Sequence, residues 1–297
     1  MANLKDLKLQ INSVGSTKKI TSAMKMVAAS KLRRSQEKAE SARPYSSRIE
    51  EMLSSLSSSG VSGEGVIKLL TGSGKKDNYL IMPVTADRGL CGGFNSSINR
   101  ETFKYVKSLE NEGKKVKLIT IGKKSRDFFS RLMKEKIIEK YADFGSSGAD
   151  YNIALDISNN IQNIFFEGQF DICVLIYNQF KSAMTQTVTR QQIIPLDVSS
   201  NDSKKDESKI SDKSIYIYEP DENEILKELL PKNVSTQIFK VLLESNAGEQ
   251  GARMVAMDNA TRNAGEMINN LTLKYNRTRQ AFITKELIEI ISGAESV

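Results

Sequence analysis

The sequence contains no histidine and no tryptophan, and it has only two cysteines among 297 residues. Histidine is the commonest general base and the commonest side chain to activate a nucleophile, so most catalytic classes lose their usual residue. Cys91 and Cys173 stand alone, without a CxxC pattern, which indicates neither a disulfide framework nor a zinc site. The composition therefore counts against an enzyme with chemistry of its own, and it favours a reducing compartment.

Long apolar runs are also missing. No stretch approaches the ~20 apolar residues that a membrane-spanning helix needs, and the N-terminus has no signal-peptide core. We expect a chain that is neither secreted nor integral to a membrane. Because no transit segment rich in Arg and Ser comes first, we expect a bacterial protein over an organellar precursor, and a mature organellar chain stays open.

The charge that is present lies unevenly. The net charge is +7, and residues 1–48 hold eleven Lys or Arg against Asp6, Glu37 and Glu40. Such a basic arm should meet an acidic partner: nucleic acid, an anionic membrane surface or an acidic protein. Only Tyr45 lies near these basic residues, so the aromatic interleaving typical of nucleic-acid binding is missing. We favour a protein-contact face over nucleic acid.

The first sixty residues predict a long helix of coiled-coil type. Their apolar residues recur in steps of three and four, with a change of register between Val14 and Ile20. We expect Pro44 to bend or interrupt this helix. The predicted stripe consists of Leu4, Leu7, Ile11, Val14, Ile20, Met24, Val27 or Ala28, Leu32, Ala39, Ala42, Ile49, Met52 or Leu53, and Leu56.

The last sixty residues carry a matching stripe. Its members are Met257, Thr261, Ala264, Ile268, Leu271, Tyr275, Thr278 and Phe282. We expect this helix to begin near residues 233–235, after Pro231, and to stop at Ser292 and Gly293. A narrow stripe cannot bury itself, so the two end helices are predicted to pair, antiparallel because the intervening chain returns to its starting point.

The middle of the chain changes to an alternating β and α pattern. The expected strands are 79–84, 116–121 and 170–177, and the expected helices are 96–111, 123–134 and 151–167. This order predicts βαβ units. Gly and Ser at 54–65 and 71–74 mark the exit from the first helix, and 199–214 is expected to be a polar loop.

Two glycine-containing stretches invite a nucleotide-binding interpretation. Residues 87–95 (DRGLCGGFN) follow a strand and precede a helix, but their spacing matches neither G-x-G-x-x-G nor a P-loop. A tight turn or a partner-contact loop is favoured there. Residues 72–76 (GSGKK) lack Ser or Thr after the lysine and are read as a linker. Glu286 and Glu289, beside Lys285, form a solvated helix face and no acid/base pair.

Several segments together resemble one protein family over the whole chain, most weakly in the middle. They are ITSAMKMVAASKLRR (20–34), TADRGLCGGFN (85–95), ARMVAMDNATRNAG (252–265) and LTLKYNRTRQAFITKELIEI (271–290). These long motifs resemble the gamma subunit of F-type ATP synthases. The resemblance implies a left-handed antiparallel coiled coil with an inserted Rossmann-like α/β domain that binds no nucleotide. The implied domains are a shaft helix at 1–60, the foot at 77–220 and a second shaft helix at 221–297.

The family's subunit is a central rotor shaft without catalytic residues or cofactors. The resemblance implies that it turns inside a hexamer of three alpha and three beta subunits, with its foot on the c ring beside the epsilon subunit. The implied location is peripheral, on the cytoplasmic face of the bacterial inner membrane. Two alternatives remain from the residues alone, a basic coiled-coil scaffold for nucleic acid and, more weakly, a nucleotide enzyme that uses the loop at 87–95.

The resemblance also implies roles for individual residues. The implied contacts with beta and alpha are Arg279, Gln280, Thr284 and Glu286, with Met24 near the same contact on the opposing helix. The implied apical bearing, which turns in an apolar sleeve, is Ile283, Leu287, Ile288 and Ile291. The implied foot contacts with the c ring and epsilon are Arg43, Tyr45, Tyr218 and Glu219.

The chain departs from the family pattern at Gly248 and Gly251, where Ala or Ser is common. Glycine in a helix costs about 1 kcal/mol relative to Ala, so we expect a locally softer shaft there.

Overall fold

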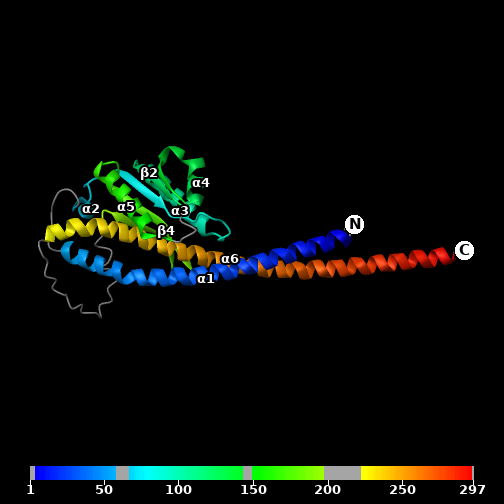
Figure 1. Ribbon diagram of the computed structural model, residues 1–297. Helices are drawn as coiled ribbons and strands as arrows, with labels where there is room; N and C mark the ends of the chain where they lie inside the picture. Colours follow the sequence, from blue (N-terminus) through cyan, green and yellow to red (C-terminus); the bar gives the residue numbers. More distant parts are fainter. Residues whose placement is uncertain (1–3, 58–66, 143–148, 197–221, 296–297) are drawn as a thin grey trace, which may run out of the picture.

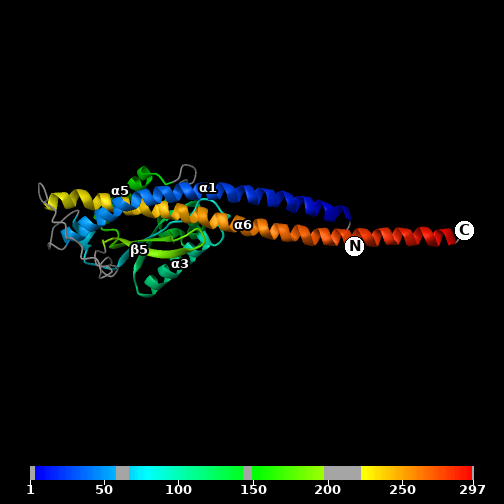
Figure 2. The same cartoon turned by 90° about the horizontal axis from the view of Figure 1, so that it is seen from below.

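A computed structural model describes residues 4–57, 67–142, 149–196 and 222–295 of the chain. Two long helices, α1 (Leu4–Ser57) and α6 (Glu222–Glu295), run side by side and antiparallel, and an α/β domain lies against one end of the pair (Figure 1). The view from below shows the same arrangement, with the C-terminal end of α6 projecting past α1 (Figure 2). The predicted coiled coil with an inserted α/β domain is confirmed.

The predicted start and stop of the second helix are wrong, and of the two outcomes expected at Pro44, a bend or an interruption, the interruption does not occur. α1 continues through Pro44, and α6 begins at Glu222, before Pro231, and continues through Gly293. A proline costs a helix one backbone hydrogen bond, and in both helices the packing of the surrounding turns outweighs that loss. At Pro44 and Pro231, tertiary packing therefore outweighs the local break signal.

The seam of α1 keeps one register along its length, so the predicted change after Val14 is also wrong. Buried and half-buried residues recur in strict steps of three and four, and only Lys18 among them is exposed. Ile20 and Val27 point away and are 60% and 57% exposed. The observed seam is Leu7, Ile11, Val14, Lys18, Thr21, Lys25, Ala28, Leu32, Ser35, Ala39, Ala42, Ser46, Ile49 and Leu53.

The seam of α6 follows its prediction as far as α1 accompanies it. Met257 and Ala264 are buried, and the other predicted members through Thr278 are half-buried. Thr21 lies opposite Thr261, and continuing this antiparallel register places Leu4 level with Thr278. From Arg279 to Ala294 every residue is exposed. The last turns of α6 therefore have no described part of α1 beside them.

The α/β domain is a five-stranded sheet in the order β3-β2-β1-β4-β5. The expected strands appear as β1 (Asn78–Pro83), β2 (Lys115–Ile121) and β4 (Ile172–Phe180), and β3 (Ile137–Tyr141) joins them in parallel. β5 (Gln186–Ile194) pairs antiparallel with β4. The sequence patterns missed β3 and β5 because both are edge strands with mixed, partly exposed residues.

Helices cover both faces of the sheet. α3 (Phe94–Asn111) and α4 (Lys123–Leu132) lie on one face, over Ile81, Leu118 and Val174. α5 (Tyr151–Phe166) and the base of α6 cover the other face, over Leu80 and Met82. Two short elements complete the domain, α2 (Lys68–Thr71) and the 3-10 turn η2 (Lys134–Lys136). Adjacent residues of β1 thus point into opposite cores, as strand geometry requires.

The middle of α6 is enclosed by α1 on one side and by the sheet and α5 on the other. Gly248 and Gly251 lie where this helix meets the β4–β5 hairpin. A Cβ at Gly251 would stand 3.2 Å from the Ala183 carbonyl oxygen, and one at Gly248 would stand 3.2 Å from the Phe94 ring. Close approach therefore supplies a reason for both glycines that the sequence did not reveal.

Candidate functional site: a groove between the shaft and the foot, and the projecting tip

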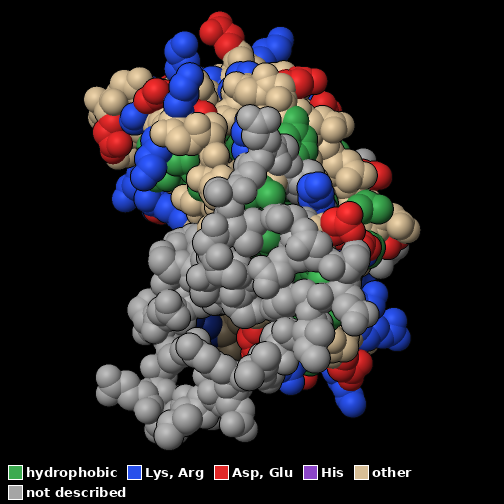
Figure 3. All heavy atoms as spheres, turned by 90° about the vertical axis from the view of Figure 1, so that its left-hand side faces the viewer, with side chains coloured by type: hydrophobic (Ala, Val, Ile, Leu, Met, Phe, Trp, Pro, Cys, Tyr) green, Lys and Arg blue, Asp and Glu red, His purple; other side chains and the backbone are tan. Residues whose placement is uncertain are grey.

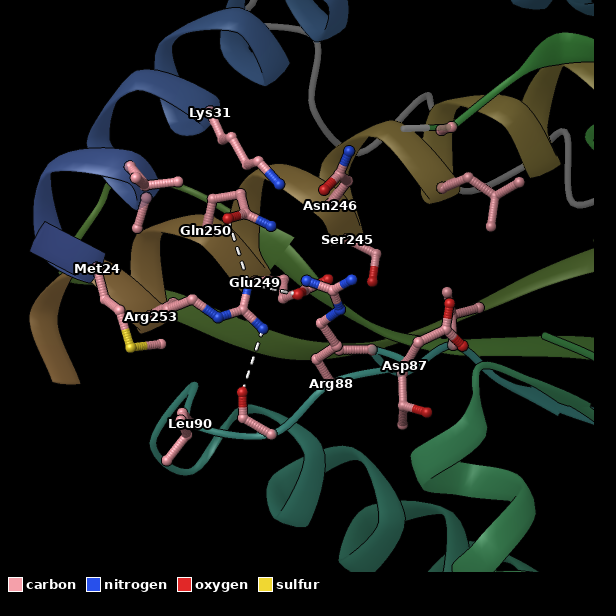
Figure 4. Close-up of a pocket in the computed structure, with 18 of the residues that line it drawn as sticks. Met24, Lys31, Asp87, Arg88, Leu90, Ser245, Asn246, Glu249, Gln250 and Arg253 are labelled. Atoms are coloured by element: carbon pink, nitrogen blue, oxygen red, sulfur yellow. Dashed lines mark hydrogen bonds and ion pairs between the residues drawn. The ribbon is translucent and has the colours of Figure 1, made fainter. Parts of the chain in front are cut away.

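A cavity of about 490 Å³ opens where α1, α6 and the segment after β1 meet. Its apolar wall is Ile20, Met24 and Val27 of α1, together with Leu90. Its polar side comes from the 85–89 segment and from α6 (Figure 4). This is the carboxyl end of β1, the place where doubly wound sheets bind their ligands. In this chain, α1 and α6 cover the carboxyl end of β1.

The segment after β1 is fixed by hydrogen bonds to the start of α4. The Asp87 carboxylate accepts the Lys123 backbone N–H at 2.9 Å, and Thr85 Oγ1 accepts the Ser125 N–H at 2.8 Å. Free N–H groups at a helix start are what attract a phosphate in nucleotide-binding folds. In this domain the chain's own carboxylate and hydroxyl occupy two of those donors. These bonds anchor the segment to the start of α4, whereas residues 87–95 themselves lead into α3.

The tip of this segment carries an exposed, constrained residue. Leu90 has a φ of 63°, a left-handed conformation that is uncommon outside glycine, and its side chain is 64% exposed. Cys91, the next residue, is buried, and burial raises the pKa of its thiol. A reactive thiolate is therefore disfavoured at Cys91. The loop presents an apolar side chain outward and keeps its sulfur inside.

An ion pair on α6 holds the loop against the shaft. Arg253 Nη1 lies 2.6 Å from Glu249 Oε1, and Arg253 Nη2 donates to the Gly89 carbonyl at 3.2 Å. The two side chains are 11% and 15% exposed. Burial raises the pKa of Glu249, and the neighbouring Arg253 partly offsets that rise. The sequence showed only an i,i+4 Glu and Arg, which is common on solvated helices, so this latch was not predicted.

Two cations stand at the mouth of the groove. Lys31 of α1 and Arg88 of the loop are both exposed, and Figure 4 shows them on opposite sides of the cavity. Together with Ile20, Val27 and Leu90 they give a surface that is apolar in the middle and basic beside it. Such a surface suits an acidic segment of another protein with apolar side chains of its own.

The predicted contact residues lie at two separate levels of the shaft. Met24 is half-buried at the groove, level with Asp258, because its neighbour Lys25 pairs with that residue. Arg279, Gln280, Thr284 and Glu286 are exposed on α6, beginning about 30 Å farther along the axis. The expectation that Met24 lies near the same contact is therefore wrong within this chain. The structure brings Met24 together with Leu90 and Lys31 instead.

The predicted bearing residues all lie on the projecting part of α6. Ile283, Leu287, Ile288 and Ile291 are 47–59% exposed. Exposed apolar residues at this density are unusual on a free helix and mark an interaction site. Lys285 and Glu289 form an exposed i,i+4 ion pair among them, as the solvated-face interpretation expected.

The predicted foot residues lie at the opposite end of the pair. Arg43 and Tyr45 are exposed on α1. Tyr218, Glu219 and the 199–214 loop fall outside the described residues. On the coloured part of that end of the molecule, Lys and Arg side chains stand among Asp and Glu, and hydrophobic patches are small (Figure 3). On the described part of this face, charges of both signs are thus interspersed.

Within the described residues, no group of three or more His, Cys, Asp or Glu side chains is arranged to hold a metal ion. None of the described helices combines the length and apolar character that crossing a bilayer demands.

Comparison with known proteins places these features in context. A family model described as ATP synthase matches residues 3–297. The ATP synthase gamma chain of Rhodospirillum rubrum is 56% identical over 302 residues, and that of Pelagibacter ubique is 51% identical over 297 residues. Each alignment covers 100% of both chains.

Solved structures agree with this result. A chain of the central stalk and c-ring structure of Tetrahymena thermophila mitochondrial ATP synthase matches with a TM-score of 0.59 and 28% identity, covering 81% of this chain and 99% of that one. A chain of the Euglena gracilis mitochondrial ATP synthase rotor matches with a TM-score of 0.66 over 94% of this chain and 98% of that one, at 16% identity, which shows the fold alone.

Proposed function

The chain belongs to the ATP synthase gamma chain family, and we propose that it is the central rotor shaft of an F-type ATP synthase. The observation that carries this proposal is the projecting end of α6. Its described residues from Arg279 onward are exposed on all sides and rich in Ile and Leu, whereas its base is packed into the foot domain. A free helix of that composition needs an enclosing partner. A hexamer of three alpha and three beta subunits would supply an apolar sleeve.

The shaft acts by differential contact. Its cross-section is asymmetric, with a foot on one side and a groove on another, so each of three surrounding beta subunits meets a different surface. A ligand or partner shifts a conformational equilibrium only as far as it binds the two states unequally. Rotation would therefore move each beta subunit in turn through states of different nucleotide affinity, and it would link ATPase activity to proton flow.

Two sets of residues would make those contacts. At the groove, Met24 and Leu90 would meet apolar side chains, with Lys31 and Arg88 beside them for acidic ones. On the projecting end of α6, Arg279, Gln280, Thr284 and Glu286 would bind polar loops of beta and alpha. The spacing of the two levels along α6 favours contacts with different parts of the surrounding subunits.

The bearing and the foot would hold the shaft at its two ends. Ile283, Leu287, Ile288 and Ile291 offer an apolar surface whose contact energy changes little with angle, which suits rotation inside a sleeve. Arg43 and Tyr45, with Tyr218 and Glu219, would contact the c ring and the epsilon subunit. The protein would then be peripheral, on the cytoplasmic face of the bacterial inner membrane.

The subunit would contribute no catalytic residues of its own. The chain has no histidine, the spacing of its loop at 87–95 matches neither G-x-G-x-x-G nor a P-loop, and Cys91 is buried. Nothing in the relatives or structures reported above supports the nucleic-acid scaffold.

Assembly tests the proposal. The purified chain, mixed with alpha and beta subunits, should co-purify as one copy with three of each, and the chain alone should not hydrolyse ATP. Turnover by the isolated chain at a rate comparable to the complex, or failure to join alpha and beta subunits, would contradict the proposal.

The two regions of the tip should respond differently to substitution. Ile288→Asp places a charge in the apolar sleeve and should weaken retention of the shaft, because burying an unpaired carboxylate is costly. Arg279→Ala should leave retention near wild type and reduce coupling of ATP hydrolysis to proton pumping. Equal retention of the Ile288→Asp variant and the wild type in gel filtration would refute the bearing.

A further inference from the structure

Two helical stripes of α1 compete for the seam between residues 18 and 28. Ile20, Met24 and Val27 recur at steps of four and three and form an apolar stripe, which hydrophobicity alone would bury. The structure instead turns a polar stripe, Thr21 and Lys25, toward α6, with Thr21 buried and the Lys25 side chain 45% exposed, and it leaves Ile20 and Val27 60% and 57% exposed. The helix is therefore rolled so that Thr21 lies inside the seam, Lys25 lies at its edge, and the apolar stripe faces the groove.

Specific contacts from α6 accompany the polar stripe. Thr261 Oγ1 and Thr21 Oγ1 are hydrogen-bonded at 2.7 Å, and the Lys25 ammonium lies 2.6 Å from the Asp258 carboxylate. Gly265 leaves room for Lys18, whose Nζ lies 3.4 Å from the place where a Cβ would be. Thr21 and Lys25 thus each meet a polar partner on α6.

The alternative roll is available to the same sequence. Burying Ile20, Met24 and Val27 needs only a local change of register after Val14, of the kind that an inserted step of three or four produces in coiled coils. On the α6 side, Met257 and Ala264 would accept apolar neighbours. That roll would draw the apolar wall of the groove into the seam and turn Lys25 out to solvent.

Polar contacts in coiled-coil seams select one arrangement among several, often at a cost in stability. We propose that Thr261 and Asp258, through Thr21 and Lys25, are positioning residues that hold α1 in the roll that presents Ile20, Met24 and Val27 to the groove. The contact role of that stripe rests on the proposed function, since a partner subunit is what would cover it. The roll itself is a property of this chain alone.

Alkylation of a single engineered cysteine reports the roll. Ile20→Cys places a thiol in the middle of the apolar stripe, while Cys91 and Cys173 are buried and react slowly. In the full chain this thiol should be alkylated rapidly by N-ethylmaleimide. Adding Thr261→Val and Asp258→Ala removes the two polar partners from α6, and the rate at position 20 should fall about tenfold or more as the thiol enters the seam.

A matched variant on α1 should behave in the opposite way. Thr21→Val with Lys25→Met makes the present seam apolar without touching α6, so α1 should keep its roll and position 20 should stay reactive. General destabilisation would accelerate alkylation at position 20 in both variants. Slower alkylation in the α6 variant, with an unchanged rate in the α1 variant, therefore indicates a change of roll. Equal rates in the α6 variant and its parent, or slowing in the α1 variant, would overturn the proposal.

Charge exchange gives an independent check. Lys25→Asp with Asp258→Lys restores the ion pair with its ends exchanged and should keep position 20 reactive, whereas Lys25→Asp alone should not. Co-purification with alpha and beta subunits then separates the two proposals. If the wild-type chain fails to assemble, the proposed function fails while the alkylation result stands, and if alkylation is insensitive to α6, only the positioning role fails.

Discussion

Asp171 illustrates how one carboxylate can organise the start of a sheet. It is 5% exposed at the beginning of β4, and it accepts hydrogen bonds from Ser73 Oγ at 2.6 Å, from the Asp77 and Asn78 backbone N–H groups, and from Asn78 Nδ2. Burial raises the pKa of this carboxyl, but the four donors outweigh it, and the pKa lies below its ordinary value. The charged form therefore ties the segment before β1 to β4.

Replacing this carboxylate should lower stability in a pH-dependent way. In Asp171→Asn the side-chain NH₂ group replaces an accepting oxygen and faces groups that are themselves hydrogen-bond donors. The free energy of unfolding should therefore fall by about 2 kcal/mol at neutral pH. Because the folded pKa is depressed, the stabilisation is present above the unfolded pKa of about 3.9 and is lost as the pH falls through the folded pKa. Urea unfolding at several pH values measures this. Asp127→Asn, on an exposed helix face, is the control. An equal effect of the two substitutions would refute the stabilising role of the hydrogen bonds that Asp171 accepts.

The Glu249–Arg253 pair should show the asymmetry expected of a buried ion pair. Arg253→Met leaves a buried carboxylate beside the loop and should cost about 3 kcal/mol, because removing one partner exposes the full desolvation penalty of the other. Adding Glu249→Gln should recover much of that loss. Thermal unfolding of the two variants checks this. If the double variant recovers no stability, the loss in Arg253→Met comes from the missing contact with Gly89 and not from the buried charge of Glu249.

At the scale of elements, the end helices were predictable because their stripes repeat over many turns. The prediction failed between Lys18 and Lys25, where Thr21 is buried in the seam while Ile20 is exposed, and only contacts across the pair decide between the two stripes. The three central strands were predictable from their apolar runs. The edge strands β3 and β5 were missed because half of their surface faces solvent.

The candidate site was only partly predictable for the same reason. Met24 was named by resemblance and the loop at 87–95 by its glycines, whereas Arg253 carries no local signal and meets the loop only when the foot folds against α6. The tip residues were named by resemblance, and their roles remain predictions.

Alanine substitutions at two glycines of the long helices distinguish close packing at Gly251 from a locally softer helix. Gly251→Ala should lower the melting temperature, because its Cβ would press on the backbone of Ala183 at 3.2–3.3 Å, which cannot move as a side chain can. Gly15→Ala meets nothing within 4 Å and should gain up to about 1 kcal/mol from helix propensity. A stabilising Gly251→Ala, measured by calorimetry, would support the softer-shaft interpretation over close packing.

At the scale of the whole molecule, the packed domain, the groove and the exposed helix end lie at different positions along the helix pair. The foot and the base of α6 form one packed unit, with the groove where that unit meets α1. The exposed end of α6 continues well beyond Leu4, the first described residue of α1 (Figures 1 and 2). A rigid foot fixed to a long helix can carry rotation from one end to the other without chemistry of its own. The packed latch at Arg253 and the close contact at Gly251 both join foot and shaft at the same turns of α6.

Direct observation of rotation tests the central claim. The chain, assembled with alpha and beta subunits that are fixed to a glass surface, would carry a bead on its foot, attached through a cysteine introduced at the exposed Met184 of the β4–β5 hairpin. Adding ATP should turn the bead steadily in one direction, in steps tied to hydrolysis at the three beta subunits. A complex that hydrolyses ATP at full rate while the foot stays still would contradict the account.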